Sequence, residues 1–98
     1  MIEVRETDAF ADWFERLKDI RAKARIIARI RRLSIGNFGD ASPVGEGVSE
    51  LRVHYGPGYR VYFVTKGRML VILLCAGTKD SQDGDIRRAK LLARELDI

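Results

Sequence analysis

The sequence of 98 residues has only one histidine, one cysteine and two prolines. The single cysteine, Cys75, excludes a disulfide framework within the chain, and its apolar neighbours predict a buried, inert thiol. With one histidine, His54, and no pair of carboxylates at ligand spacing, the sequence gives poor support to a metal site. A serine or cysteine triad would need His54 in the same pocket as the nucleophile, so that chemistry is weakly supported too.

Long apolar runs and nucleotide-binding motifs are also missing. The most apolar stretch, Leu70 to Ala76, is too short to cross a bilayer, and Met1 to Asp8 lack the apolar centre of a signal peptide. Walker, dinucleotide-binding and nucleophile-elbow patterns do not occur, and neither do repeats. We therefore expect a soluble, cytoplasmic protein with no cofactor and no membrane association, which the low cysteine content also favours.

The charge of the chain is positive and comes mainly from arginine. Eighteen basic residues, 13 of them arginine, outnumber 14 acidic residues, which gives a net charge of +4. Arginine favours planar, bidentate contact with phosphate or carboxylate groups. An anionic partner is therefore plausible, although the charge alone does not choose between a nucleic acid and an acidic protein. The length and ordinary globular composition predict a single domain over residues 1–98.

Apolar periodicity predicts three helices. The first starts after Thr7 or Asp8, and a second runs from about Ile20 to Leu33. A third is expected from about Asp85 to Leu96. The inner faces of the first two helices carry apolar residues at spacings of three and four, namely Phe10, Trp13, Phe14, Leu17, Ile26, Ile27, Ile30 and Leu33.

Between the second and third helices the pattern changes to that of strands. Residues 48–55, 59–66 and 69–76 read as three strands joined by turns at Gly56-Pro57-Gly58 and Lys66-Gly67-Arg68. Residues 2–5 could form a further short strand, and residues 36–47 are expected to be an irregular loop. The order β-α-α-β-β-β-α predicts a compact α+β domain with a small antiparallel sheet and a helical hairpin on one face.

A row of cations follows the second helix at helical spacing. Three readings remain open for this row: a solvated face, a ridge that tracks nucleic-acid phosphates, or a docking surface for an acidic partner. Its members are Lys18, Arg21, Arg25, Arg29 and Arg32.

Strand alternation gathers a second group of polar residues on one sheet face. If the strands pair around the Gly56-Pro57-Gly58 turn, Arg52 and Arg60 lie on neighbouring strands with His54 and Tyr62 beside them. Lys79 follows the next strand and could reach that side. Such a group could hold a phosphodiester and stabilise charge that develops on it, while His54 or Tyr62 moves a proton. The alternative is that Arg52 pairs with Glu50 or solvent and that Tyr62 only packs.

Two segments carry a resemblance to a known family. Residues 50–63 read ELRVHYGPGYRVYF, and residues 73–89 read LLCAGTKDSQDGDIRRA. Together they resemble the small toxins of the RelE/ParE superfamily, within the HigB-like "addiction module killer" group. The resemblance implies a RelE-like α+β fold and a toxin neutralised in a hetero-oligomer by a cognate antitoxin, usually a helix-turn-helix protein. Many members cleave mRNA on the ribosome without a metal, by attack of a 2′-hydroxyl on its own phosphate.

The resemblance also points to particular residues. Arg60 matches the family's central sheet arginine, Lys79 its basic position after the last strand, and Arg52 the arginine of ELR, whereas His54 and Tyr62 come from strand geometry alone. The family's GGDK reads Ala76-Gly77-Thr78-Lys79 here, so an acidic position is lost. The leading expectation is a ribosome-dependent mRNA endonuclease. The alternatives are a ParE-like poison of DNA gyrase and a degenerate toxin that only binds its antitoxin.

Overall fold

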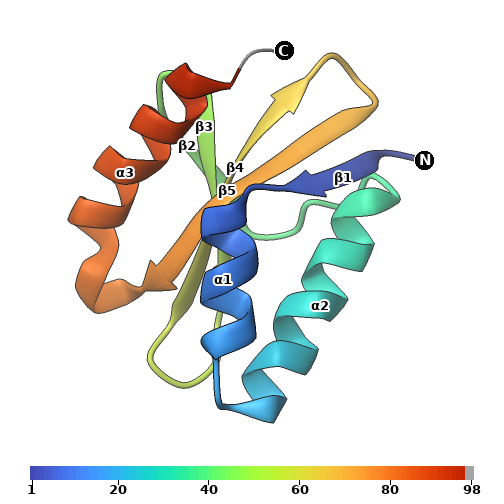
Figure 1. Ribbon diagram of the computed structural model, residues 1–98. Helices are drawn as coiled ribbons and strands as arrows, with labels where there is room; N and C mark the ends of the chain where they lie inside the picture. Colours follow the sequence, from blue (N-terminus) through green and yellow to red (C-terminus); the bar gives the residue numbers. More distant parts are fainter. Residues whose placement is uncertain (97–98) are drawn as a thin grey trace.

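The computed structural model describes residues 1–96 and has an α+β fold, as the sequence predicts (Figure 1). A short 3₁₀ turn over Lys79–Ser81 precedes the last helix. The other elements, in chain order, are β1 (Glu3–Glu6), α1 (Asp8–Arg16), α2 (Ile20–Ser34), β2 (Ala41–Gly45), β3 (Val48–Val53), β4 (Tyr59–Lys66), β5 (Leu70–Thr78) and α3 (Gln82–Glu95).

The strands form one sheet in the order β1-β5-β4-β3-β2. The meander of β3, β4 and β5 is antiparallel, as expected for strands joined by tight turns. The first strand joins the edge of the sheet but runs parallel to β5, with Glu3 opposite Leu70. The sheet is therefore mixed, where the sequence predicted an antiparallel one. The finer expectation of a RelE-like topology stays a prediction.

Besides shifts of one or two residues at the ends of several elements, two parts of the chain differ from the sequence-based expectation. The segment 36–47, expected to be an irregular loop, contains β2, which pairs antiparallel with β3 through an irregularity between Pro43 and Gly45. This strand lies at the edge of the sheet, where a proline and a bulge are tolerated because one side needs no partner. The last helix begins at Gln82, three residues before the expected Asp85.

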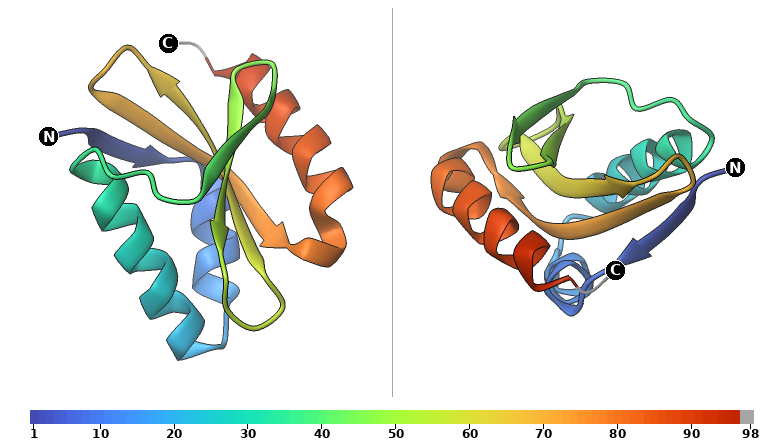
Figure 2. Two further views of the ribbon diagram at one scale, coloured as in Figure 1. Left: turned by 180° about the vertical axis from the view of Figure 1, so that it is seen from behind. Right: turned by 90° about the horizontal axis from the view of Figure 1, so that it is seen from above.

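The helices cover both faces of the sheet (Figure 2). The apolar side chains of α1 and α2, among them Phe10 and Ile26, pack with Leu51 and Val61 on one face. On the other face the side chains of α3 pack with Leu74, Cys75 and their neighbours. Burial raises the pKa of the Cys75 thiol to about 11, in agreement with the inert thiol that the sequence predicts.

Side-chain caps fix where the first two helices begin. The Thr7 hydroxyl accepts a hydrogen bond from the backbone N–H of Phe10 at 3.1 Å, and the Asp19 carboxylate accepts from the backbone N–H groups of Arg21 and Ala22 at 3.0 and 3.1 Å.

Within residues 1–96, none of the helices combines the length and the apolar character that crossing a membrane requires.

Candidate functional site

The strand register brings the predicted basic residues to one end of the sheet. Arg52 on β3 lies directly opposite Arg60 on β4, so the two side chains share a face, as expected. Tyr59, the first residue of β4, lies opposite Thr78, the last residue of β5. Lys79 follows Thr78 and therefore lies beside the start of β4, close to Arg60.

The Gly56-Pro57-Gly58 turn ties Arg60 and Lys79 together. The Gly58 carbonyl accepts hydrogen bonds from Arg60 Nη1 and from the backbone N–H of Lys79, both at 2.8 Å. Gly58 has a φ of +78°, and a Cβ added there would lie 2.7 Å from Arg60 Nη1. Only glycine combines this backbone conformation with so close an approach of the guanidinium.

A cleft of about 460 Å³ opens beside this turn. No carboxylate is among the described residues that line it, and the buried Arg60 Nε has no hydrogen-bond partner. The cleft thus holds positive charge that no lining carboxylate neutralises, an arrangement suited to an anionic ligand. Its lining residues are His54, Tyr55, Gly56, Pro57, Gly58, Arg60 and Lys79.

His54 lines the cleft and is hydrogen-bonded to Asp40, which is not among the lining residues. The imidazole is 72% exposed, and its Nε2 lies 2.5 Å from Asp40 Oδ2. This hydrogen bond, together with the charge of nearby Arg52, holds the pKa of the Asp40 carboxyl below its usual range. Because Nε2 faces Asp40, Nδ1 is the ring nitrogen left for a ligand. Sequence reasoning missed Asp40, because it lies 14 residues from His54 in a segment expected to be irregular.

Arg52 does not line the cleft. Its guanidinium donates to Glu50 Oε1 at 3.0 Å, to Asp40 Oδ1 at 3.2 Å and to Ser42 Oγ at 3.1 Å. The hydrogen bond to Glu50 is the largest cause that raises the pKa of Arg52. Of the two readings that the sequence left open, the structure has the one in which Arg52 pairs with Glu50.

Tyr62 is also outside the cleft, although it shares a sheet face with Arg60. Its side chain is fully buried, and its hydroxyl donates to Glu50 Oε2 at 3.2 Å, where Gln82 Nε2 also donates at 2.7 Å. Burial, followed by the charge of Glu50, raises the pKa of the Tyr62 hydroxyl far above its usual value. Tyr62 therefore packs beneath α3 and does not open to the cleft, because strand alternation cannot reveal which part of a face a helix covers.

The segment that carries Lys79 is fixed by a second close approach. A Cβ added to Gly77 would lie 1.8 Å from Asp85 Oδ2, so no larger residue fits there without rearrangement. Ser81 Oγ donates to the same Asp85 oxygen at 2.5 Å and accepts from the Thr78 backbone at 3.2 Å. These contacts hold the 3₁₀ turn, and with it the position of the Lys79 backbone.

The predicted row of cations begins at Lys18, which precedes α2, and continues along α2 with engaged and exposed members. The Arg29 guanidinium donates to the backbone carbonyls of Phe38, at 3.2 Å, and of Arg52. Desolvation by burial lowers the pKa of Arg29. The Arg25 guanidinium lies 4.7 Å from the centroid of the Tyr55 ring. The remaining members, Lys18, Arg21 and Arg32, are exposed.

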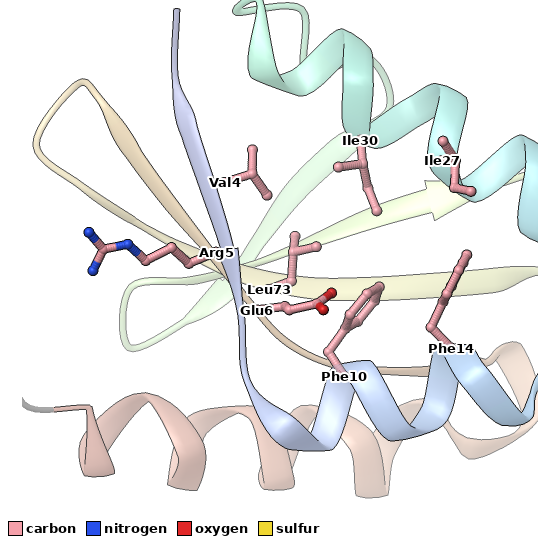
Figure 3. A pocket seen from close by; sticks show the side chains of 8 residues that line it. All are labelled: Val4, Arg5, Glu6, Phe10, Phe14, Ile27, Ile30 and Leu73. Carbon is pink, nitrogen blue, oxygen red and sulfur yellow. The ribbon is translucent and has the colours of Figure 1, made fainter.

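Another hollow, of about 610 Å³, is lined by none of these cations (Figure 3). Phe10 and Phe14 from α1 face Ile27 and Ile30 from α2 across an apolar groove that β1 closes on one side.

Over residues 1–96, no group of three or more histidine, cysteine, aspartate or glutamate residues is placed to hold a metal ion.

Two comparisons with known proteins place the chain in a family. Residues 12–97 match the family described as phage derived protein Gp49-like (DUF891). An uncharacterised protein of Haemophilus influenzae is 53% identical over 97 residues, which cover 99% of this chain and 98% of the relative. The chain therefore belongs to the Gp49-like family, a phage-derived family of RelE and addiction-module toxin-like proteins.

Proposed function

We propose that this protein is the toxin of a type II toxin–antitoxin module, in the HigB-like group of the RelE/ParE superfamily, and that it cleaves mRNA on the ribosome. The observation that carries the proposal is the cleft at the Gly56-Pro57-Gly58 turn, which Arg60, Lys79 and His54 line and which no carboxylate of residues 1–96 lines. Family membership supports the toxin assignment, and the chemistry of the cleft supports RNA as the substrate.

The proposed reaction is attack of a ribose 2′-hydroxyl on the adjacent phosphate. A bond forms between the 2′-oxygen and phosphorus, and the bond from phosphorus to the 5′-oxygen breaks. The products are a 2′,3′-cyclic phosphate and a 5′-hydroxyl. Charge builds up on the phosphate oxygens in the transition state, where Arg60 and Lys79 stabilise it.

His54 takes the proton of the 2′-hydroxyl at Nδ1, while its Nε2 stays bound to Asp40. Asp40 is a positioning residue in this scheme, because it fixes which ring nitrogen faces the substrate. The leaving 5′-oxygen receives its proton from water. Tyr62 has no part in the proposal, since its hydroxyl is buried against Glu50.

Arg68 offers a matched control for the role of Arg60. Arg60 lies at the start of β4, whereas Arg68 is exposed in the turn beyond its other end. Each protein should be expressed without an antitoxin while growth, transcript ends and DNA breaks are followed. We expect the wild type and Arg68→Ala to stop growth and cut transcripts in translated regions, and Arg60→Ala to do neither.

Three results would contradict the proposal. If folded Arg60→Ala cut transcripts at the same rate as Arg68→Ala, the cleft would not take part in cleavage. DNA breaks with intact transcripts would indicate a gyrase poison. Normal growth with wild-type protein present would indicate a degenerate toxin that only binds its antitoxin.

We further propose that the antitoxin, a helix-turn-helix protein, inserts apolar side chains into the groove between α1 and α2 and places acidic residues against Lys18 and Arg21. Ile27 lines this groove and is 37% exposed. Ile27→Asp should weaken antitoxin binding while leaving RNA cleavage unchanged. Binding that is insensitive both to this substitution and to salt would argue against this interface.

A further inference from the structure

A second, smaller hollow adjoins the cleft on the side of α2. It has a volume of about 230 Å³ and shares His54 with the cleft. Val53, which is buried, contributes an apolar wall, and Ala28 leaves space because its side chain is small. Its lining residues are Arg25, Ala28, Arg29, Arg32, Val53 and His54.

Three guanidinium groups and one imidazole surround this hollow, and no carboxylate is among the described residues that line it. The Arg29 guanidinium is occupied by backbone carbonyls, which leave its positive charge in place. Arg25 stacks on Tyr55, and no side-chain partner of Arg32 occurs within residues 1–96. Arg32 can therefore donate fully to a ligand.

The two hollows share one lining residue, His54, and consecutive residues of the chain line them. Val53 and His54 line the smaller hollow, while His54 and Tyr55 line the cleft. A ligand that passes over His54 would meet cations on both sides, with Arg60 and Lys79 on one and Arg25 and Arg32 on the other. A single RNA strand matches this arrangement, because it carries one negative charge per nucleotide along a flexible backbone.

We propose that the hollow between α2 and the end of β3 is a second phosphodiester subsite, which binds the RNA strand next to the phosphate held in the cleft. Arg32 and Arg25 hold the neighbouring phosphate, and the apolar wall formed by Val53 and Ala28 contacts the sugar or base. This inference rests on the proposed function for the choice of RNA. With this subsite, the protein binds two phosphates of the RNA and not only one.

Arg31 supplies a matched control for Arg32. Both arginines are exposed on α2 and adjacent in the sequence, but Arg31 does not line the hollow. The probes are 2′-O-methyl RNA oligonucleotides, which cannot be cleaved through the 2′-oxygen. A dinucleotide carries one phosphodiester and fills only the cleft, whereas a tetranucleotide reaches the hollow as well. Binding is followed through backbone amide shifts in NMR spectra of the full-length protein.

For the tetranucleotide, Arg32→Ala should lower the affinity about tenfold relative to Arg31→Ala, the value of one hydrogen bond to a charged group. The salt dependence of its binding should also decrease by about one phosphate contact, a change of roughly 0.7 in slope. For the dinucleotide, the two variants should bind equally. The tetranucleotide, and not the dinucleotide, should shift the amides of Ala28 and Val53.

If Arg32→Ala and Arg31→Ala lost tetranucleotide binding equally, the subsite proposal would be wrong. It would also be wrong if Arg32→Ala lost as much affinity for the dinucleotide as for the tetranucleotide. A hexaglutamate peptide that shifts Ala28 and Val53 when the tetranucleotide does not would assign the hollow to an acidic protein. Because the probes cannot be cleaved, this result is independent of catalysis. A second phosphate subsite can therefore stand if cleavage fails, and cleavage in the cleft can stand if the subsite fails.

Discussion

Arg52 and Arg60 lie opposite each other on neighbouring strands, yet the molecule uses their charges differently. The Arg52 guanidinium is surrounded by Glu50, Asp40 and Ser42. Within residues 1–96, the one hydrogen bond of the Arg60 side chain goes to the Gly58 carbonyl of the turn, and Arg60 lines the cleft. The same residue type at paired positions is thus bound by carboxylates in one strand and lines a cleft in the next, and the deciding factor is where the carboxylates lie.

The largest effect that tests this comparison concerns activity. Arg60→Met should lower the rate of RNA cleavage by about 10²–10³-fold, the cost of removing one preorganised donor from a developing oxyanion. Arg52→Met should have a much smaller effect, because Arg52 does not line the cleft. Single-turnover cleavage of mRNA in purified ribosome complexes measures both rates, and a larger loss in Arg52→Met would reverse the assignment.

Stability should show the opposite order. Arg52→Met leaves Glu50, which is only 1% exposed, without its cationic partner, and a buried carboxylate without a counter-charge is destabilising. Arg60→Met removes one hydrogen bond to a backbone carbonyl. Thermal unfolding of the two variants should therefore give the larger drop in Tm for Arg52→Met. Equal drops would mean that Arg52 contributes little to holding Glu50.

The turn glycine allows a test of the cleft with a matched control. Gly58 and Gly67 have φ angles of +78° and +60°, but an added Cβ meets the Arg60 guanidinium only at Gly58 and open space at Gly67. Alanine at either position should cost about 1–2 kcal/mol of stability from backbone strain. Only Gly58→Ala should also impair cleavage, since it displaces Arg60. If the two variants cleaved RNA at equal rates, the conformation of the Gly58 turn would not matter for cleavage.

Tyr62 tests whether the covered part of the sheet face takes part in chemistry. Tyr62→Phe removes the hydrogen bond to Glu50 and should cost about 1 kcal/mol of unfolding free energy. The cleavage rate of the folded variant should stay at the wild-type value, because the hydroxyl does not reach the cleft. Denaturant unfolding measures the free energy, and single-turnover kinetics measure the cleavage rate. A rate loss larger than tenfold would mean that the Tyr62 hydroxyl takes part in cleavage.

The smallest expected effect concerns Asp40 and its pH dependence. The pKa of Asp40 lies below its ordinary value near 3.8, chiefly because of the hydrogen bond to His54. A carboxyl whose pKa is lower in the folded state contributes stability that is complete above the unfolded pKa and is lost as the pH falls through the folded pKa. His54→Ala should raise the pKa of Asp40 and shrink this acid-dependent loss. Carbon-13 NMR of the carboxyl measures the pKa of Asp40, and an unchanged pKa in His54→Ala would mean that His54 does not lower it.

The sequence predicted the meander, the helical hairpin and the shared face of Arg52 and Arg60, because these follow from periods of two and 3.6 residues. It missed β2, since a five-residue edge strand with proline and glycine has no such period. It also missed Asp40, whose partners lie 12 and 14 residues away. Alternation placed Tyr62 on the correct face but could not show that α3 covers it, because the docking of a helix depends on tertiary packing.

The same limit applies to the cations of α2. Helical spacing gathered Arg25, Arg29 and Arg32 in one row, but only the folded chain brings the 36–40 segment under Arg29 and Tyr55 under Arg25. Spacing along an element therefore predicts which side chains are neighbours. It does not predict which of them remain available to a ligand.

In the proposed mechanism, the cleft at the Gly56-Pro57-Gly58 turn stabilises attack of a 2′-hydroxyl on the neighbouring phosphate. The most direct measurement is the end chemistry of mRNA incubated with the protein and programmed ribosomes, with and without a single 2′-deoxy substitution at the cut position. We expect 2′,3′-cyclic phosphate and 5′-hydroxyl ends, and no cleavage at the deoxy position. Cleavage that persists at the deoxy position, or that leaves 5′-phosphate ends, would contradict it.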